Sequence, residues 1–205
     1  MRECPDCWVW SGWSKESFTA ARRGAGEMFL WESAWRQSSL SVEFGKAKML
    51  NRHFQEFIEL LARNSVRYLI VGGYAVGLHG FPRYTGDMDV FIMLSQKNAK
   101  SVLKSFEDFG FGDLGLSEKD FLEEEIVVEI GREPLKIQVL TGIDGVTFEE
   151  CWEERKEVDL SGTVVPFIGI ESLLKNKAAS PRAKDKIDFE ELKRIKGEQD
   201  AAQDG

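Results

Sequence analysis

The stretch 71–90 constrains the fold of this chain more than any other. An apolar run ends there in two glycines, Gly72 and Gly73. After a turn marked by proline, two aspartates, Asp87 and Asp89, lead into a second apolar run. Residues two apart on a β-strand point to the same side, so both carboxylates are expected on one face, where they repel each other unless a cation or a proton lies between them. The stretch therefore predicts a cation site at the start of a buried strand.

Both the ligand type and the glycines favour a magnesium–nucleotide site. Hard oxygen ligands suit magnesium, which proteins commonly bind together with substrate phosphates. Gly72 and Gly73 let the backbone turn and approach a ligand without a Cβ in the way, and they stand where a helix N-terminus could receive phosphates. A plain strand-to-helix turn remains an alternative for the glycines, and a solvated strand end remains one for the aspartates.

The full string of the stretch resembles the polymerase-beta-like nucleotidyltransferase superfamily. Gly-Gly, thirteen residues and then Asp-x-Asp follow its signature, and Val-Gly-Gly-Tyr-Ala-Val, His-Gly and Pro-Arg-x-Thr are similar to its small prokaryotic branch. That branch includes minimal nucleotidyltransferases and the AbiEii-like nucleotidyltransferases of toxin–antitoxin systems. The resemblance implies transfer of a nucleoside monophosphate from a nucleoside triphosphate (NTP) to a hydroxyl group of RNA, protein or a small molecule. In a toxin–antitoxin system it also implies an antitoxin partner.

The resemblance assigns roles to individual polar residues. Asp87 and Asp89 are expected to be catalytic and to hold two magnesium ions, which place the attacking and leaving oxygens in line. The nucleotide-binding residues that it implies are Gly72, Gly73, Arg83, Thr85, Lys177 and Arg182. Other roles remain open, because Arg83 can also neutralise the aspartates and Thr85 can cap the turn. We expect His79 to be a packing or capping residue rather than a base.

One catalytic position departs from the pattern of this branch. Members that catalyse bring a third carboxylate from a neighbouring strand, and the matching position here holds Gln138. An amide carries no negative charge and is a poor base, so Gln138 cannot deprotonate an attacking hydroxyl. Catalysis then depends on the two aspartates, with Glu129 of the paired strand as a substitute if its side chain faces the site. The alternative is a catalytically weakened module that binds a nucleotide or a partner.

A second group of charged residues lies in the C-terminal helices. The segment 173–188 is similar to the Asn-Lys-x-Ala-x-x-x-Arg-x-Lys-Asp-x-x-Asp stretch of the same branch. Lys177 is expected to contact the triphosphate, because its stem can pack while its ammonium reaches inward. Arg182 is expected to assist, and Asp185 and Asp188 to orient these cations or cap the last helix. A solvated face of mixed charge is the alternative.

Periodicity divides the chain into two parts. Residues 1–48 hold five of the six tryptophans without a sustained helical or strand period, and are expected to be a disordered or non-domain extension or a docking arm. Residues 49–205 are expected to form one α+β domain with the nucleotidyltransferase fold, a mixed sheet of about four or five strands and helices mainly on one face. The expected helices are 50–64, 74–78, 96–109, 148–154, 170–179 and 183–196, and the expected strands are 67–71, 88–93, 126–130, 135–140 and a hairpin through 158 and 163–167.

Composition and charge limit which partners the protein can bind and where in the cell it is expected. The net charge of −8 argues against broad nucleic-acid binding but not against a nucleotide pocket. No apolar run approaches the roughly 20 residues that cross a bilayer, and the N-terminus lacks the apolar core of a signal peptide. We therefore expect a cytoplasmic protein without a membrane partner. Cys4 and Cys7 form an isolated Cys-x-x-Cys, and a zinc site would need two further ligands, for which the candidates are Cys151, His53 and His79.

Overall fold

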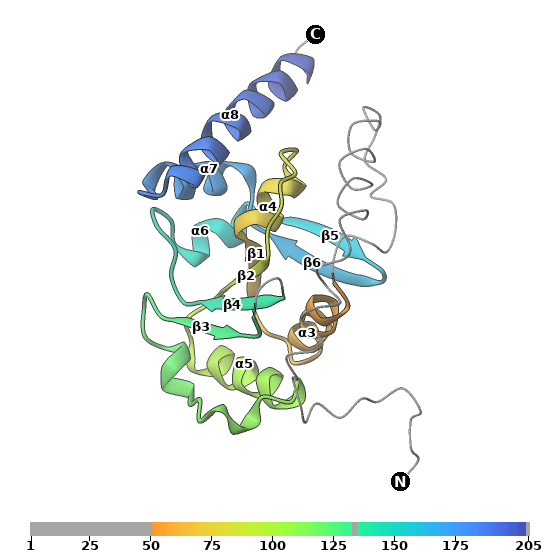
Figure 1. The fold of residues 1–205 in the computed structure, drawn as a ribbon, viewed down its shortest axis with the longest axis vertical. Helices are drawn as coiled ribbons and strands as arrows, with labels where there is room; N and C mark the ends of the chain where they lie inside the picture. Colours follow the sequence, from red (N-terminus) through yellow and green to blue (C-terminus); the bar gives the residue numbers. More distant parts are fainter. Residues whose placement is uncertain (1–50, 133–134, 204–205) are drawn as a thin grey trace. The chain divides into compact units, whose positions relative to one another are not determined.

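The computed structural model describes residues 51–132 and 135–203, and Figure 1 shows their arrangement. The Trp-rich segment 1–48 and its Cys-x-x-Cys lie outside the described residues. The helices are α3 (Arg52–Arg63), α4 (Gly72–Leu78), α5 (Gln96–Asp108), α6 (Phe148–Glu153), α7 (Ile170–Ala179) and α8 (Ala183–Gln203), with the 3₁₀ turns η2 (Gly112–Leu114) and η3 (Glu118–Phe121). The strands are β1 (Tyr68–Val71), β2 (Asp87–Ile92), β3 (Val127–Ile130), β4 (Lys136–Leu140), β5 (Lys156–Leu160) and β6 (Thr163–Phe167).

The strands of the described residues form one mixed sheet in the order β3-β4-β2-β1-β6-β5. β2 lies between β1, to which it is antiparallel, and β4, to which it is parallel. The predicted α+β class is confirmed, but the sheet has six strands rather than four or five. β5 is an edge strand whose Glu157 and Asp159 are exposed. Apolar residues do not alternate clearly along β5, so the sequence predicted only Val158 of this strand.

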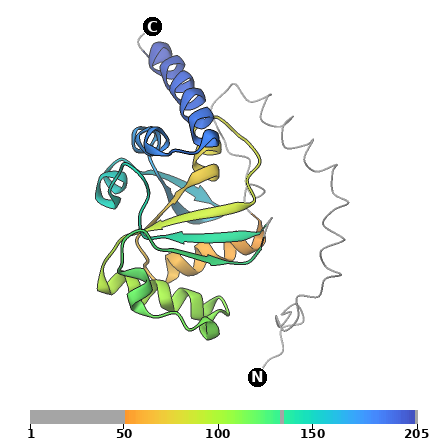
Figure 2. The ribbon, with the colours of Figure 1, turned by 60° about the vertical axis from the view of Figure 1, so that its left-hand side comes forward.

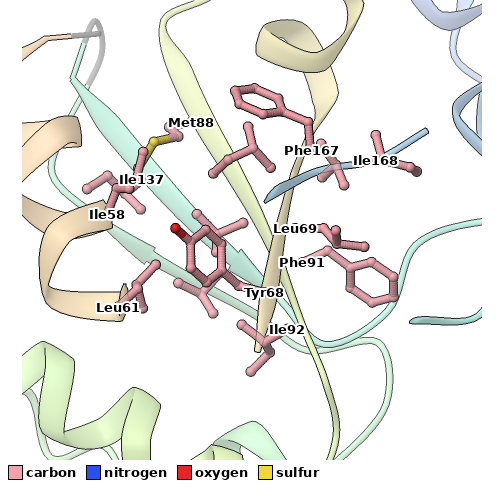
Figure 3. Close-up of a cluster of buried hydrophobic side chains, with 14 of the residues drawn as sticks. Ile58, Leu61, Tyr68, Leu69, Met88, Phe91, Ile92, Ile137, Phe167 and Ile168 are labelled. Atoms are coloured by element: carbon pink, nitrogen blue, oxygen red, sulfur yellow. The ribbon is translucent and has the colours of Figure 1, made fainter. Parts of the chain in front are cut away.

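Helices cover both faces of the sheet around β2, whereas the sequence led us to expect them mainly on one face. In Figure 3, Ile58 and Leu61 of α3 lie beside Tyr68 of β1, whereas Phe91 of β2 points away from α3. Phe91 packs against Phe148 of α6 with their ring centroids 5.2 Å apart, and is fully buried. Burying a side chain of this size stabilises a fold by roughly 1.5–3 kcal/mol. The strand that carries the two aspartates is therefore held between two apolar layers.

The helix ends follow local sequence signals, with one exception. Ser95 caps α5 as predicted, because its Oγ accepts a hydrogen bond from the backbone N–H of Asn98 at 3.2 Å. The last helix was expected to end at residue 196, but α8 continues to Gln203. Its last turns lack an apolar stripe, and ion pairs along the helix surface, such as that between Arg194 and Glu198 at 2.7 Å, favour the extension instead. None of the helices among the described residues combines the length and the apolar character that a membrane span requires.

Candidate active site

Strand register brings the predicted polar residues to one level of the sheet. Asp89 of β2 pairs with Gln138 of β4, and Gln138 pairs with Glu129 of β3. β2 and β4 lie side by side in both Figure 1 and Figure 2. Side chains directly opposite each other on neighbouring strands share a face, and Asp87 joins them because it lies two residues before Asp89. One face of the sheet therefore presents three carboxylates and an amide.

The two glycines make room for side chains of this site. Gly72 begins α4 with φ +60°, a conformation that L residues rarely adopt, and a Cβ there would overlap Oδ2 of Asp89. A Cβ on Gly73 would lie 2.6 Å from Oγ1 of Thr85. The sequence suggested that the glycines let a ligand approach, whereas the close approach in this structure is made by the protein's own carboxylate and hydroxyl. The Gly-Gly and Asp-x-Asp elements therefore depend on each other sterically.

The two aspartates differ in their surroundings. Thr85 donates its hydroxyl to Oδ1 of Asp87 at 2.6 Å, and so orients that carboxylate. Burial raises the pKa of Asp89 to about 6, and the negative charge of Asp87 adds to the rise. The cations that oppose this rise are Lys177, Arg182 and Lys136. The structure therefore gathers three positive side chains close enough to act on Asp89.

The donor set fits a divalent cation such as magnesium. Asp87 and Asp89 offer hard oxygens on one face, and a divalent cation between them would relieve the repulsion that contributes to the raised pKa of Asp89. Among the described residues, no group of three or more His, Cys, Asp or Glu side chains is arranged to hold a metal ion. The two aspartates would therefore share the cation with substrate or water oxygens, which is how proteins commonly bind magnesium.

A buried ion network connects the C-terminal helices with the loop before β2. Lys177 is 2% exposed, and its Nζ lies 2.5 Å from Oδ1 of Asp185 and 3.5 Å from Oδ2 of Asp188. Arg83 binds both carboxylate oxygens of Asp188, through Nε and Nη2, each at 2.7 Å. Such a bidentate pair has strict geometry. Asp188 therefore ties the loop that precedes the aspartates to α8.

Asp185 organises the other side of the network. It accepts hydrogen bonds at 2.6 Å from the hydroxyl of Ser180 and from Nε of Arg182, whose side chain is 73% exposed. The alternative of a solvated face is wrong for Asp185 and Asp188, because both are buried. The expectation that they orient Lys177 and Arg182 agrees with these contacts. Arg83 was expected to meet a phosphate or the metal aspartates, but its guanidinium pairs with Asp188.

Gln138, which lies opposite Asp89 on β4, interacts with Glu129 of the next strand. Gln138 donates its amide N–H to Oε1 of Glu129, and Lys136 Nζ lies 3.1 Å from the same oxygen. The sequence analysis did not single out Lys136, although the period of two along the strand places it on the same face as Gln138.

His79 is the C-cap residue of α4, and its Nε2 donates to the carbonyl of Ile168 at 2.8 Å. Its predicted packing or capping role is confirmed.

A mixed sheet with two aspartates entering a strand beside a Gly-Gly turn is the arrangement that the resemblance to nucleotidyltransferases leads us to expect. The model of the family described as "Nucleotidyl transferase of unknown function (DUF2204)" matches residues 50–203. The chain belongs to this family, and the protein is a small nucleotidyltransferase.

Several solved structures are also similar to the chain. A putative nucleotidyltransferase from Thermotoga maritima is 14% identical with a TM-score of 0.42, over 74% of this chain and 89% of that one. A lincosamide antibiotic adenylyltransferase with bound lincomycin is 14% identical with a TM-score of 0.44, over 73% and 99%. An antigenic nucleotidyltransferase-like protein from Paracoccidioides brasiliensis is 15% identical with a TM-score of 0.41, over 70% and 74%. The comparison with curated proteins gives no match. The family match establishes the class.

Proposed function

We propose that this nucleotidyltransferase depends on magnesium and moves a nucleoside monophosphate from an NTP to a hydroxyl group of RNA, a protein or a small molecule. The observation that supports this proposal is the placement of Asp87 and Asp89 on one face of the sheet, with three cations acting on Asp89. Action in a toxin–antitoxin system, with an antitoxin as partner, rests on the motif resemblance.

Asp87 and Asp89 would hold magnesium, which supplies positive charge where negative charge builds on the phosphoryl oxygens. Thr85 fixes the direction of the Asp87 carboxylate through its 2.6 Å hydrogen bond. Gly72 and Gly73 keep the space behind these side chains free of Cβ atoms, so that the carboxylate and the hydroxyl can take these positions. This part of the site positions the reacting groups.

We assign the binding of the triphosphate to Lys177, with Arg182 assisting. Lys177 is buried with Asp185 and Asp188 as its partners, and its positive charge, which already acts on Asp89, would also favour a phosphate beside that carboxylate. Arg182 uses Nε on Asp185, so its exposed terminal nitrogens can bind a phosphate. The guanidinium of Arg83 donates two hydrogen bonds to the carboxylate of Asp188. We therefore propose that Arg83 holds the loop before β2 in place.

The second candidate function is nucleotide binding with weakened catalysis. One observation favours it: the position directly opposite Asp89 on β4 holds Gln138, whose amide cannot take a proton. Both functions predict NTP binding, and only the first predicts transfer of the labelled nucleotide.

Labelled NTPs distinguish the two functions. The full chain is incubated with magnesium and each labelled NTP, with total RNA and total protein as acceptors, and NTP binding is measured by calorimetry. Asp87→Asn/Asp89→Asn is expected to lose transfer by about 100-fold or more. Glu157→Gln/Asp159→Asn is the control, because it removes two carboxylates of the same spacing from the edge strand β5. NTP binding without transfer to any acceptor establishes the second function, and absence of both excludes a nucleotide site.

A further inference from the structure

Transfer to a hydroxyl group calls for a base, because the hydroxyl attacks efficiently when a positioned group takes its proton. In the proposed function Asp87 and Asp89 are committed to the cation. His79 already donates to the carbonyl of Ile168. Burial raises the pKa of Tyr74 to about 12, so its phenol stays protonated. A protein base at this site is then a further carboxylate on the same face of the sheet.

Glu129 is a carboxylate in the required place. It stands in one row with Gln138 and Asp89, because β3 pairs with β4 and β4 with β2 at this level. Half of its side chain is exposed (50%), so an acceptor can reach it from solvent. The negative charge of Asp87 acts on it, which places Glu129 within the electrostatic reach of the cation site.

The neighbours of Glu129 on β4 hold its carboxylate in an ionised and oriented state. Lys136 Nζ lies 3.1 Å from Oε1, and Gln138 Nε2 donates to the same oxygen. The hydrogen bond from Lys136 and that from Gln138 lower the pKa of Glu129, so the carboxylate is ionised at neutral pH. Within the described residues both bonds end on Oε1, which leaves Oε2 to accept a proton. The positive charge of Lys136 also lowers the pKa of Asp89, so one cation interacts with both carboxylates.

We propose that Glu129 is the catalytic base of the transfer reaction, in place of a carboxylate on β4; this inference rests on the proposed function. The hydroxyl of the acceptor gives its proton to Oε2 of Glu129 while its oxygen forms a bond to the α-phosphorus of the NTP. The bond between the α-phosphorus and the bridging oxygen breaks, and pyrophosphate leaves with the electron pair. The products are the nucleotidylated acceptor, pyrophosphate and a protonated Glu129.

This assignment gives Gln138 a defined function. An amide at this position donates a hydrogen bond to Oε1 of Glu129, whereas a second carboxylate there would repel Glu129 across the strand pair. Gln138 is therefore a positioning residue for Glu129. The carboxylate and the amide act as a pair, and exchanging them between the two strands keeps the composition of the row.

The test compares Glu129→Gln with the parent enzyme, using the NTP and the acceptor that the labelled-NTP experiment identifies. Glutamine keeps the size of the side chain and an oxygen that accepts from Lys136, but it removes the basic carboxylate. Transfer is expected to fall by about 100-fold or more, while the calorimetric Kd for the NTP stays within about threefold. Glu157→Gln is the matched control, because Glu157 lies on β5, is 51% exposed and pairs with Arg155 at 2.8 Å. It is expected to leave transfer unchanged.

The exchange variant Glu129→Gln/Gln138→Glu returns a carboxylate to this level of the sheet. Its rate of transfer is expected to be at least about tenfold higher than that of Glu129→Gln. Equal transfer by Glu129→Gln and the parent overturns the inference and leaves the proposed function standing. A parallel loss of transfer and of NTP affinity in Glu129→Gln also overturns it, because Glu129 is then a binding or structural residue. Absence of transfer by the parent ends the proposed function and the inference with it.

Discussion

The Asp89 carboxylate packs directly against Gly72, with Oδ2 in the space that a Cβ would take. Gly72 also has φ +60°, so both its backbone and its surroundings exclude a side chain. The absence of a Cβ at residue 72 leaves the room that the Asp89 carboxylate occupies, and desolvation is the largest cause of the raised pKa of Asp89. A side chain at residue 72 would therefore displace one of the two carboxylates of the cation site.

Gly72→Ala is expected to destabilise the protein and to displace Asp89. The left-handed backbone alone costs roughly 1–3 kcal/mol for a residue other than glycine, and the overlap with Asp89 adds to this cost. Urea unfolding measures the total. Gly115→Ala is the control, because Gly115 has φ +70° but its Cβ would meet nothing within 4 Å. The same loss of stability in both variants would contradict a specific contact between Gly72 and Asp89.

Asp188→Ala is expected to lower the free energy of unfolding by about 3–5 kcal/mol, because it removes the carboxylate that pairs with Arg83 and leaves Lys177 with Asp185 as its counter-ion. Thermal and urea unfolding check this value. Glu191→Ala removes a carboxylate from the surface of the same helix, where it pairs with Arg194, and is expected to leave the unfolding midpoint near that of the parent. Equal midpoints for the two variants would show that the buried network does not hold the helix.

The elements of the fold could be predicted because their signals are local. Ser95 caps α5 from the adjacent position, and the apolar run 68–71 marks β1. The extension of α8 to Gln203 could not be predicted from apolar periodicity, since surface ion pairs rather than an apolar stripe accompany it. The edge strand β5 was only partly predicted, because it exposes most of its side chains.

The candidate site could be predicted where strand period decides the geometry. Asp87 and Asp89 share a face because they lie two residues apart on one strand. The partner of Arg83 could not be predicted, because Asp188 lies 105 positions away in the sequence and reaches Arg83 through the packing of α8. The contact between Gly72 and Asp89 has the same origin, since it depends on how β1 and β2 pair.

The metal-free protein is expected to lose stability as Asp89 ionises. The pKa of Asp89 is about 6 in the folded state, which is above the ordinary aspartate pKa of 3.8. Between about pH 4 and pH 6 the folded protein therefore binds more protons than the unfolded chain. The contribution of Asp89 is present at low pH and is lost as the pH rises through this range, by up to about 3 kcal/mol. Urea unfolding of the parent and of Asp89→Asn, from pH 4 to pH 7 with a chelator, measures it. Identical pH profiles would contradict the shift.

Magnesium is expected to reverse this loss at pH 7. A cation that binds the two ionised aspartates stabilises the folded state in proportion to its occupancy. The Tm of the parent should therefore rise when magnesium replaces the chelator, and the Tm of Asp87→Asn/Asp89→Asn should not. An equal rise in Glu157→Gln/Asp159→Asn is expected, because those carboxylates lie on β5. An equal rise in the variant that lacks both site aspartates would place the magnesium elsewhere.

Arg182→Gln is expected to weaken NTP binding by about tenfold without unfolding the protein. Its side chain is 73% exposed, and its terminal nitrogens are available to a phosphate while Nε pairs with Asp185. Arg194→Gln is the matched control, because Arg194 also pairs with a carboxylate three residues away and is 56% exposed. Calorimetry with an NTP and magnesium measures both affinities. If Arg182 binds the triphosphate, only its variant loses affinity, and the loss shrinks at high salt because ions screen exposed charges.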